Sequence, residues 1–148
     1  MFVDMLDMKI IKALQTDARK PIVRLAREVG ANEATVRRRI DKLLKERIIE
    51  RFTVVLNYHK LGRAIKAFIG LRVQPAKLRE IVDHLSKHPD IQVLYRTSGD
   101  TDIFAEVIFE KMEDLNEFLE EELRIEGILG TIVTVVIGPY KRCPWTGL

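Results

Sequence analysis

The spacing of apolar residues changes along the chain from a helical period to a strand period, and this change limits the possible folds. Up to residue 46, apolar residues recur three and four positions apart. From residue 65 they alternate, beginning with Ile65, Ala67 and Ile69. Since each period buries a different kind of face, we expect an α+β chain with a helical amino-terminal domain and a mixed carboxy-terminal domain.

The first 46 residues carry three helical patterns separated by short breaks. These patterns predict helices over residues 4–15, 21–29 and 33–46. Gly30 suits the end of the second helix, and Asn32 is a good N-cap for the third. Two short helices joined by a tight turn that contains glycine are typical of a helix-turn-helix.

The third predicted helix carries the cluster Arg37-Arg38-Arg39 in its first half. A helix fits the major groove of duplex DNA, where arginine can bond guanine with two hydrogen bonds. The alternative is a solvated arginine-rich helix paired with acids. We predict that the DNA-binding residues are Asn32, Glu33, Thr35, Arg37, Arg38, Arg39 and Lys42.

The charge of the chain is unevenly distributed. Residues 1–62 hold 14 Lys and Arg against 8 Asp and Glu, whereas residues 63–148 hold 11 against 14. A basic first part favours a polyanionic partner such as double-stranded DNA, although a solvated basic face would give the same count.

Residues 48–56 are predicted to form a strand that connects the two domains, and Gly62 suits a turn after it. We therefore expect a helix-turn-helix domain with its connecting strand at 1–56 and a linker at 57–64. A second domain should occupy residues 65–139, followed by a carboxy-terminal tail at 140–148.

The second domain reads as strand, helix, strand, strand, helix, strand. The strands are predicted at 65–73, 91–97, 103–109 and 131–137, with one helix opening at Pro75 and another at 112–123. This order is that of the ferredoxin-like βαββαβ fold, in which two helices cover one face of an antiparallel sheet.

The other face of the predicted sheet is mostly apolar. A large exposed apolar face usually marks a protein partner, and a two-fold homodimer is the simplest outcome. Such a dimer would place two DNA-reading helices on successive half-sites. The residues expected on this face are Phe68, Phe104, Ile108, Ile132, Thr134 and Val136.

Several classes of protein are disfavoured. The longest apolar runs are too short to span a bilayer and the first residues do not resemble a secretory signal, so we expect a cytoplasmic protein without a membrane partner. Cys143 is the only cysteine and is expected to be a reduced thiol. His84 and His88 are expected to form a surface pair rather than a metal site.

The sequence also gives no sign of an enzyme. No catalytic set, phosphate loop or cofactor motif is present, so we do not expect catalytic activity.

Short motifs in a fixed order resemble one family. They are Val3 to Ile11, Asp17-Ala18-Arg19, Leu25-Ala26 with Val29-Gly30, Thr35 to Leu43, Gly99-Asp100-Thr101-Asp102, and Gly127 to Thr131. Together they resemble the leucine-responsive regulatory protein/AsnC (Lrp/AsnC) family of transcription regulators over Val3 to Pro139. Three positions depart from the family pattern: Arg47 stands in place of glycine, Thr101 in place of tyrosine and Val133 in place of threonine.

The resemblance implies a transcription regulator that responds to a small molecule. It implies a ferredoxin-like (ACT-like) second domain, dimers through that domain, and in many members rings of four dimers. It also implies an amino-acid effector bound by Gly99, Asp100, Thr101, Asp102 and Thr131. The residues alone leave open another class, a ligand-binding regulatory subunit of an enzyme whose basic helix docks a protein.

Overall fold

The computed structural model describes residues 3–138 and 140 of the 148-residue chain. The chain forms two compact units, which divide between Val55 and Leu56. Cys143, which is expected to be a reduced thiol, lies outside the described residues. None of the described helices combines the length and the apolar character that crossing a membrane requires.

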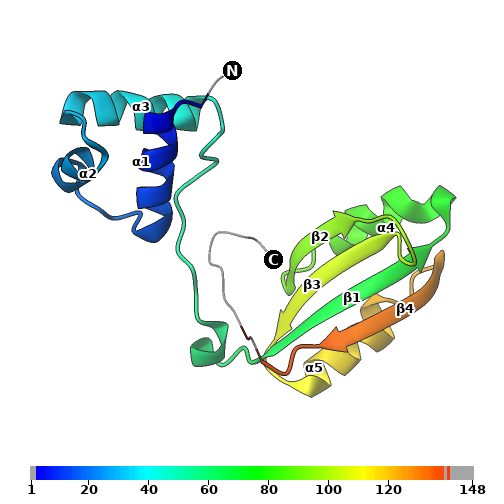
Figure 1. Ribbon diagram of the computed structural model, residues 1–148. Coiled ribbons are helices and arrows are strands. Elements are labelled where there is room, and N and C mark those ends of the chain that lie inside the picture. Colours follow the sequence, from blue (N-terminus) through cyan, green and yellow to red (C-terminus); the bar gives the residue numbers. More distant parts are fainter. Residues whose placement is uncertain (1–2, 139, 141–148) are drawn as a thin grey trace. The chain divides into compact units, whose positions relative to one another are not determined.

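The first unit contains the three predicted helices: α1 (Met5–Thr16), α2 (Ile22–Val29) and α3 (Glu33–Lys45) (Figure 1). The Asp4 carboxylate accepts a hydrogen bond from the Asp7 N–H at 2.9 Å and caps α1. Gly30 ends α2 with a φ of 73°, in the left-handed region that glycine adopts without penalty. The three boundaries agree with the prediction to within about one residue.

The core of the first unit is made of the apolar stripes of its helices. Ile10 of α1, Leu25 of α2, and Val36 and Leu43 of α3 are completely buried. Burying a side chain of this size contributes roughly 1.5–3 kcal/mol, so the stripes that the sequence pattern identified hold the three helices together.

The prediction of a strand at 48–56 is wrong. This segment has no strand structure, and the described sheet contains only strands of the second unit. A strand needs a neighbouring backbone to satisfy its hydrogen bonds, and no described strand lies beside this one. Apolar side chains that would have alternated in a sheet, including Phe52, Val54 and Leu56, are exposed instead.

The second unit contains a four-stranded antiparallel sheet in the order β2-β3-β1-β4. Its strands are β1 (Ile65–Val73), β2 (Ile91–Arg96), β3 (Ile103–Phe109) and β4 (Ile128–Val135). The strand order and the βαββαβ sequence of elements confirm the predicted ferredoxin-like fold. Strand β4 begins three residues before the predicted Thr131, because Ile128 already pairs with Val73 of β1.

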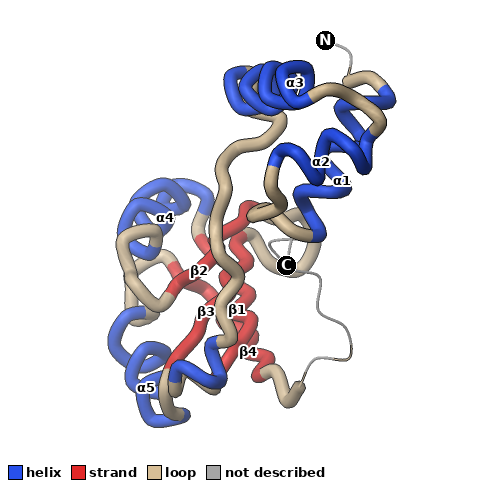
Figure 2. Tube along the Cα trace, turned by 90° about the vertical axis from the view of Figure 1, so that its left-hand side faces the viewer, coloured by secondary structure: helices blue, strands red, loops and turns tan. Residues whose placement is uncertain are grey.

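Two helical regions cover one face of this sheet (Figures 1 and 2). The first consists of the short 3₁₀ turn η2 (Pro75–Lys77) and α4 (Leu78–Leu85), and the second of α5 (Met112–Glu117) and the π-helical turn η3 (Phe118–Glu122). A further 3₁₀ turn, η1 (Tyr58–Leu61), lies in the predicted linker. The core between sheet and helices contains Ile69, Leu71, Ile81, Leu85, Val107, Leu115 and Phe118.

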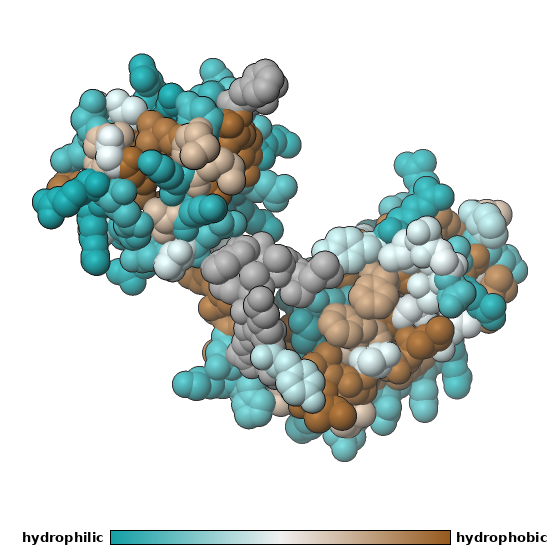
Figure 3. All heavy atoms as spheres, viewed as in Figure 1, coloured by the Kyte–Doolittle hydropathy of each residue, from teal (hydrophilic) through white to brown (hydrophobic). Residues whose placement is uncertain are grey.

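No helix of the described residues lies over the other face of the sheet, and apolar side chains gather there (Figures 2 and 3). The rings of Phe68 and Phe104 stack with their centroids 5.5 Å apart, and Ile132 is 57% exposed. Ile108 lies on this face as the sequence pattern predicts, since it pairs with Lys66, but its side chain is buried. The sequence analysis did not predict a charge on this face, yet Glu106 is buried there in a 2.5 Å ion pair with Lys66.

Candidate nucleic-acid and effector sites

The outer surface of α3 presents two free arginines. Val36 and Leu43 turn the inner side of the helix into the core, while Arg37 and Arg38 are exposed. Neither guanidinium forms an ion pair with any residue that the structure describes. Both side chains are therefore available to a partner outside the unit.

Arg39 is used differently from its two neighbours. Its guanidinium lies 2.5 Å from the Asp4 carboxylate and 3.2 Å from that of Asp7, and so ties α3 to the start of α1. The Asp7 side chain is almost completely buried, so Arg39 compensates a charge that would otherwise be costly. The Asp7 N–H, together with Arg39, lowers the pKa of Asp4 below its ordinary value of 3.8. A DNA contact by Arg39 remains a prediction, but its guanidinium already has two partners.

The remaining predicted DNA-binding residues lie on or beside the same helix. Asn32 caps α3, since its side-chain oxygen accepts a 2.7 Å hydrogen bond from the Thr35 N–H. Glu33 is exposed, and Thr35 is partly exposed one turn before Arg38. Lys42 is partly exposed, with its ammonium 4.0 Å from Asp7. The structure therefore gathers these residues along α3, and their contact with DNA stays a prediction.

Four of the five predicted effector residues line one hollow of about 570 Å³ at the sheet. The loop after β2 supplies Gly99, Asp100 and Thr101, and β4 supplies Thr131. They come together because the loop meets β1, the strand that pairs with β4. The hollow is completed by Gly70, Arg72, Gly130 and Ile132.

Asp102 does not line this hollow but holds the loop in place. Its N–H donates to the Leu71 carbonyl at 2.8 Å, and its carboxylate accepts from the Val73 N–H, also at 2.8 Å. Asp102 therefore fastens the loop to the end of β1. Two aspartates of one short motif thus have separate roles, because only Asp100 faces the hollow.

Sequence reasoning missed the residues that β1 contributes to the hollow. Arg72 belongs to the alternating set of β1 that faces away from the helices, so its position could have been read from the strand period. The alternation of side chains along a strand does not show which residue of the neighbouring strand lies opposite. In the sheet, Arg72 of β1 lies opposite Gly130 of β4.

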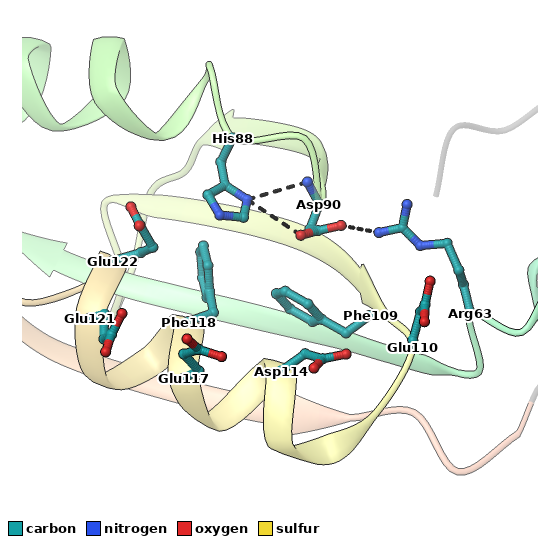
Figure 4. Close-up of a pocket in the computed structure, with 10 residues that line it drawn as sticks. All are labelled: Arg63, His88, Asp90, Phe109, Glu110, Asp114, Glu117, Phe118, Glu121 and Glu122. Atoms are coloured by element: carbon teal, nitrogen blue, oxygen red, sulfur yellow. Dashed lines mark hydrogen bonds and ion pairs between the residues drawn. The ribbon is translucent and has the colours of Figure 1, made fainter.

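A second hollow, of about 360 Å³, lies beside α5 and η3 (Figure 4). Arg63 and the Nδ1 atom of His88 both approach the Asp90 carboxylate, so the residues before β1 and before β2 are held together. The other lining residues are mainly acidic: Glu110, Asp114, Glu117, Glu121 and Glu122. Within the described part of the chain, no cluster of three or more His, Cys, Asp or Glu residues is arranged to hold a metal ion.

Family comparisons match both units. Residues 3–44 match the AsnC-type helix-turn-helix domain, and residues 66–146 match the Lrp/AsnC ligand binding domain. The chain is 34% identical to the HTH-type transcriptional regulator FL11 of Pyrococcus horikoshii over 94% of this chain and 92% of that protein. It is also 34% identical to the HTH-type transcriptional regulator Ptr1 of Methanocaldococcus jannaschii, over 93% of this chain and 94% of the relative.

Solved structures show the same fold at lower identity. The AsnC protein of Escherichia coli superimposes with a TM-score of 0.89 at 24% identity, over 96% of this chain and 97% of that one. A transcriptional regulator of Neisseria meningitidis, solved as a complex with L-Met, superimposes with a TM-score of 0.91 at 21% identity. That match covers 99% of this chain and 96% of the other.

Proposed function

The chain belongs to the Lrp/AsnC family of transcription regulators, and on this basis we propose that it reads specific DNA sequences through α3 and responds to an amino acid. The observation that supports this most directly is the exposed pair Arg37 and Arg38 on a helix whose opposite side is buried. Such a helix can enter the major groove with its outer side chains toward the base edges.

We assign different contributions to the residues of α3. In this proposal Arg37 and Arg38 bond guanine or phosphate, while Thr35 lies one turn closer to the helix start. Arg39 positions α3 through Asp4 and Asp7. Because residues 1–62 carry a net charge of +6, phosphate contacts should make the affinity fall steeply as salt is raised.

The decisive experiment is a gel-shift titration of the full chain on an operator selected from random DNA. Arg38→Ala should weaken specific binding by about 1–3 kcal/mol, because a bidentate base contact is lost. Arg79→Ala, which removes an exposed arginine from α4 in the other unit, is the matched control and should leave the affinity unchanged. Equal operator affinity of the Arg38 variant and the unaltered chain would refute the assignment.

We further propose that an amino-acid effector occupies the hollow at Gly99, Asp100, Thr101 and Thr131. The L-Met complex of the Neisseria relative supports an amino acid as the class of effector. An effector can change DNA binding only if it favours one state of the protein over another, and a change of assembly is the route we propose.

Self-association is the remaining part of the proposal. No described helix covers the face that carries Phe68, Phe104 and Ile132, and a second copy placed over it would bury exposed apolar surface. A two-fold dimer would also present two copies of α3 to successive half-sites. Assembly of four such dimers into a ring, which the family resemblance implies, stays a prediction.

A further inference from the structure

We infer that Arg72 makes the hollow at Gly99–Thr101 selective for amino acids whose side chain carries a second carboxylate. This inference rests on the proposed role of the hollow as the effector site. It concerns the chemical class of the effector, which family membership leaves open.

The guanidinium of Arg72 lies over a glycine of the neighbouring strand. Arg72 pairs with Gly130 across β1 and β4, and a Cβ atom at position 130 would lie 3.3 Å from both Nε and Nη2 of Arg72. Because Gly130 has no side chain, the Arg72 guanidinium can lie directly over it. No acidic side chain of the described residues forms an ion pair with Arg72.

The loop on the other side of the hollow is fixed closely against β1. Thr97 donates from its hydroxyl to the Thr101 carbonyl at 2.8 Å, and Asp102 fastens the loop to Leu71 and Val73. The Thr101 methyl group packs on Gly70, where a Cβ atom would come within 2.7 Å of it. The loop is therefore held in one position relative to Arg72.

This fixed loop offers groups that suit the common part of an amino acid. The N–H groups of Gly99, Asp100 and Thr101 donate to no described residue, and the Asp100 carboxylate accepts from none. An α-carboxylate can be bound by the free N–H groups and an α-ammonium group by Asp100. Both charges of the amino-acid backbone are thereby matched on the loop side.

Arg72 then remains as a cation without a partner on the strand side. Ile132 is the only large apolar residue among the described residues that line the hollow, so an apolar effector side chain would bury little apolar surface there. It would also exclude water from a guanidinium without replacing the lost hydrogen bonds. A side-chain carboxylate can pair with the guanidinium through two parallel hydrogen bonds.

Isothermal titration calorimetry of the full-length chain tests this inference. The titrants are L-glutamate and L-aspartate, their isosteric amides L-glutamine and L-asparagine, and L-methionine. We expect an acidic amino acid to bind about tenfold or more tightly than its amide, as expected for a charge-assisted hydrogen bond. Arg72→Gln should abolish this preference, and Arg72→Lys should retain part of it because the charge remains.

Arg124→Gln is the matched control, since it removes an exposed arginine that does not line the hollow and should leave the preference intact. Equal binding of acid and amide, or an unchanged preference in Arg72→Gln, would overturn the inference and leave the proposed effector site standing. Binding of none of the amino acids would overturn both. The gel-shift titration would still report separately on DNA binding.

Discussion

Arg47 has an unusual backbone conformation immediately after α3. Its φ is 54°, and it is the only residue other than glycine with a positive φ among those described. The Ile48 N–H donates to the Leu43 carbonyl at 2.9 Å and the Arg47 N–H to that of Leu44 at 3.0 Å, which is the Schellman pattern of a helix end. This ending favours glycine, since a Cβ atom in the left-handed region is strained.

We expect Arg47→Gly to stabilise the first unit by about 1 kcal/mol, because the strain at the helix end is relieved. Urea denaturation of the full chain, followed by circular dichroism, measures the change. Glu46→Gly is the matched control: Glu46 has a φ of −88°, so glycine relieves no strain there and should lower stability. A loss of stability in Arg47→Gly would argue against strain at this position.

An ion pair between the buried Asp7 and the partly exposed Arg39 joins α1 to α3. Asp7 has no exposed surface, and Arg39 reaches it across 32 positions of sequence. Apolar packing alone allows helices to rotate or slide, whereas a carboxylate and a guanidinium must meet at defined atoms. The pair therefore fixes how α3 lies against α1, and with it the direction in which Arg37 and Arg38 point.

Arg39→Met should destabilise the first unit by about 1–3 kcal/mol, because the buried Asp7 carboxylate would keep only the Asp4 N–H and the more distant Lys42 ammonium as partners. Arg38→Met, at the neighbouring exposed position, should change stability by less than about 0.5 kcal/mol. A double-mutant cycle with Asp7→Asn separates the ion pair from other effects of each substitution. If the two substitutions proved additive, Arg39 and Asp7 would not act as a pair.

The helices and strands themselves could be predicted from the sequence, because each depends on the local spacing of apolar residues and on nearby capping residues. Asn32 and Gly30 mark the turn before α3 directly, and the strand period identifies β1 and β3. The contribution of Arg72 to the hollow could not be predicted, since it depends on which residue of β4 lies opposite. Residues 48–56 have the apolar alternation of a strand but no described strand beside them.

The open face of the sheet is the surface through which we propose that two copies of the chain associate. Phe68 and Phe104 stack on it, Ile132 is exposed, and the Lys66–Glu106 ion pair adds buried charge beside the rings. The Lys66 ammonium lies 5.5 Å from the centre of the Phe68 ring, which places a cation over an aromatic face.

We expect Phe104→Glu to weaken self-association of the full chain, since a carboxylate would enter an apolar contact beside Glu106. Sedimentation velocity over a range of concentrations measures the change. Met112→Glu is the control, because Met112 is 41% exposed on α5, away from this face. An unchanged assembly in Phe104→Glu, with the fold intact by circular dichroism, would place the interface elsewhere.

Asp102 holds the loop of the hollow against β1, so it differs from the residues that line the hollow and can be varied. Its carboxylate accepts from the Val73 N–H, so replacing the side chain would remove that bond and loosen the loop from β1. Engineers who wish to convert this chain into a sensor for another metabolite should therefore randomise Arg72, Asp100, Thr101 and Thr131. Libraries that keep Asp102 constant should retain more folded members than libraries that vary it.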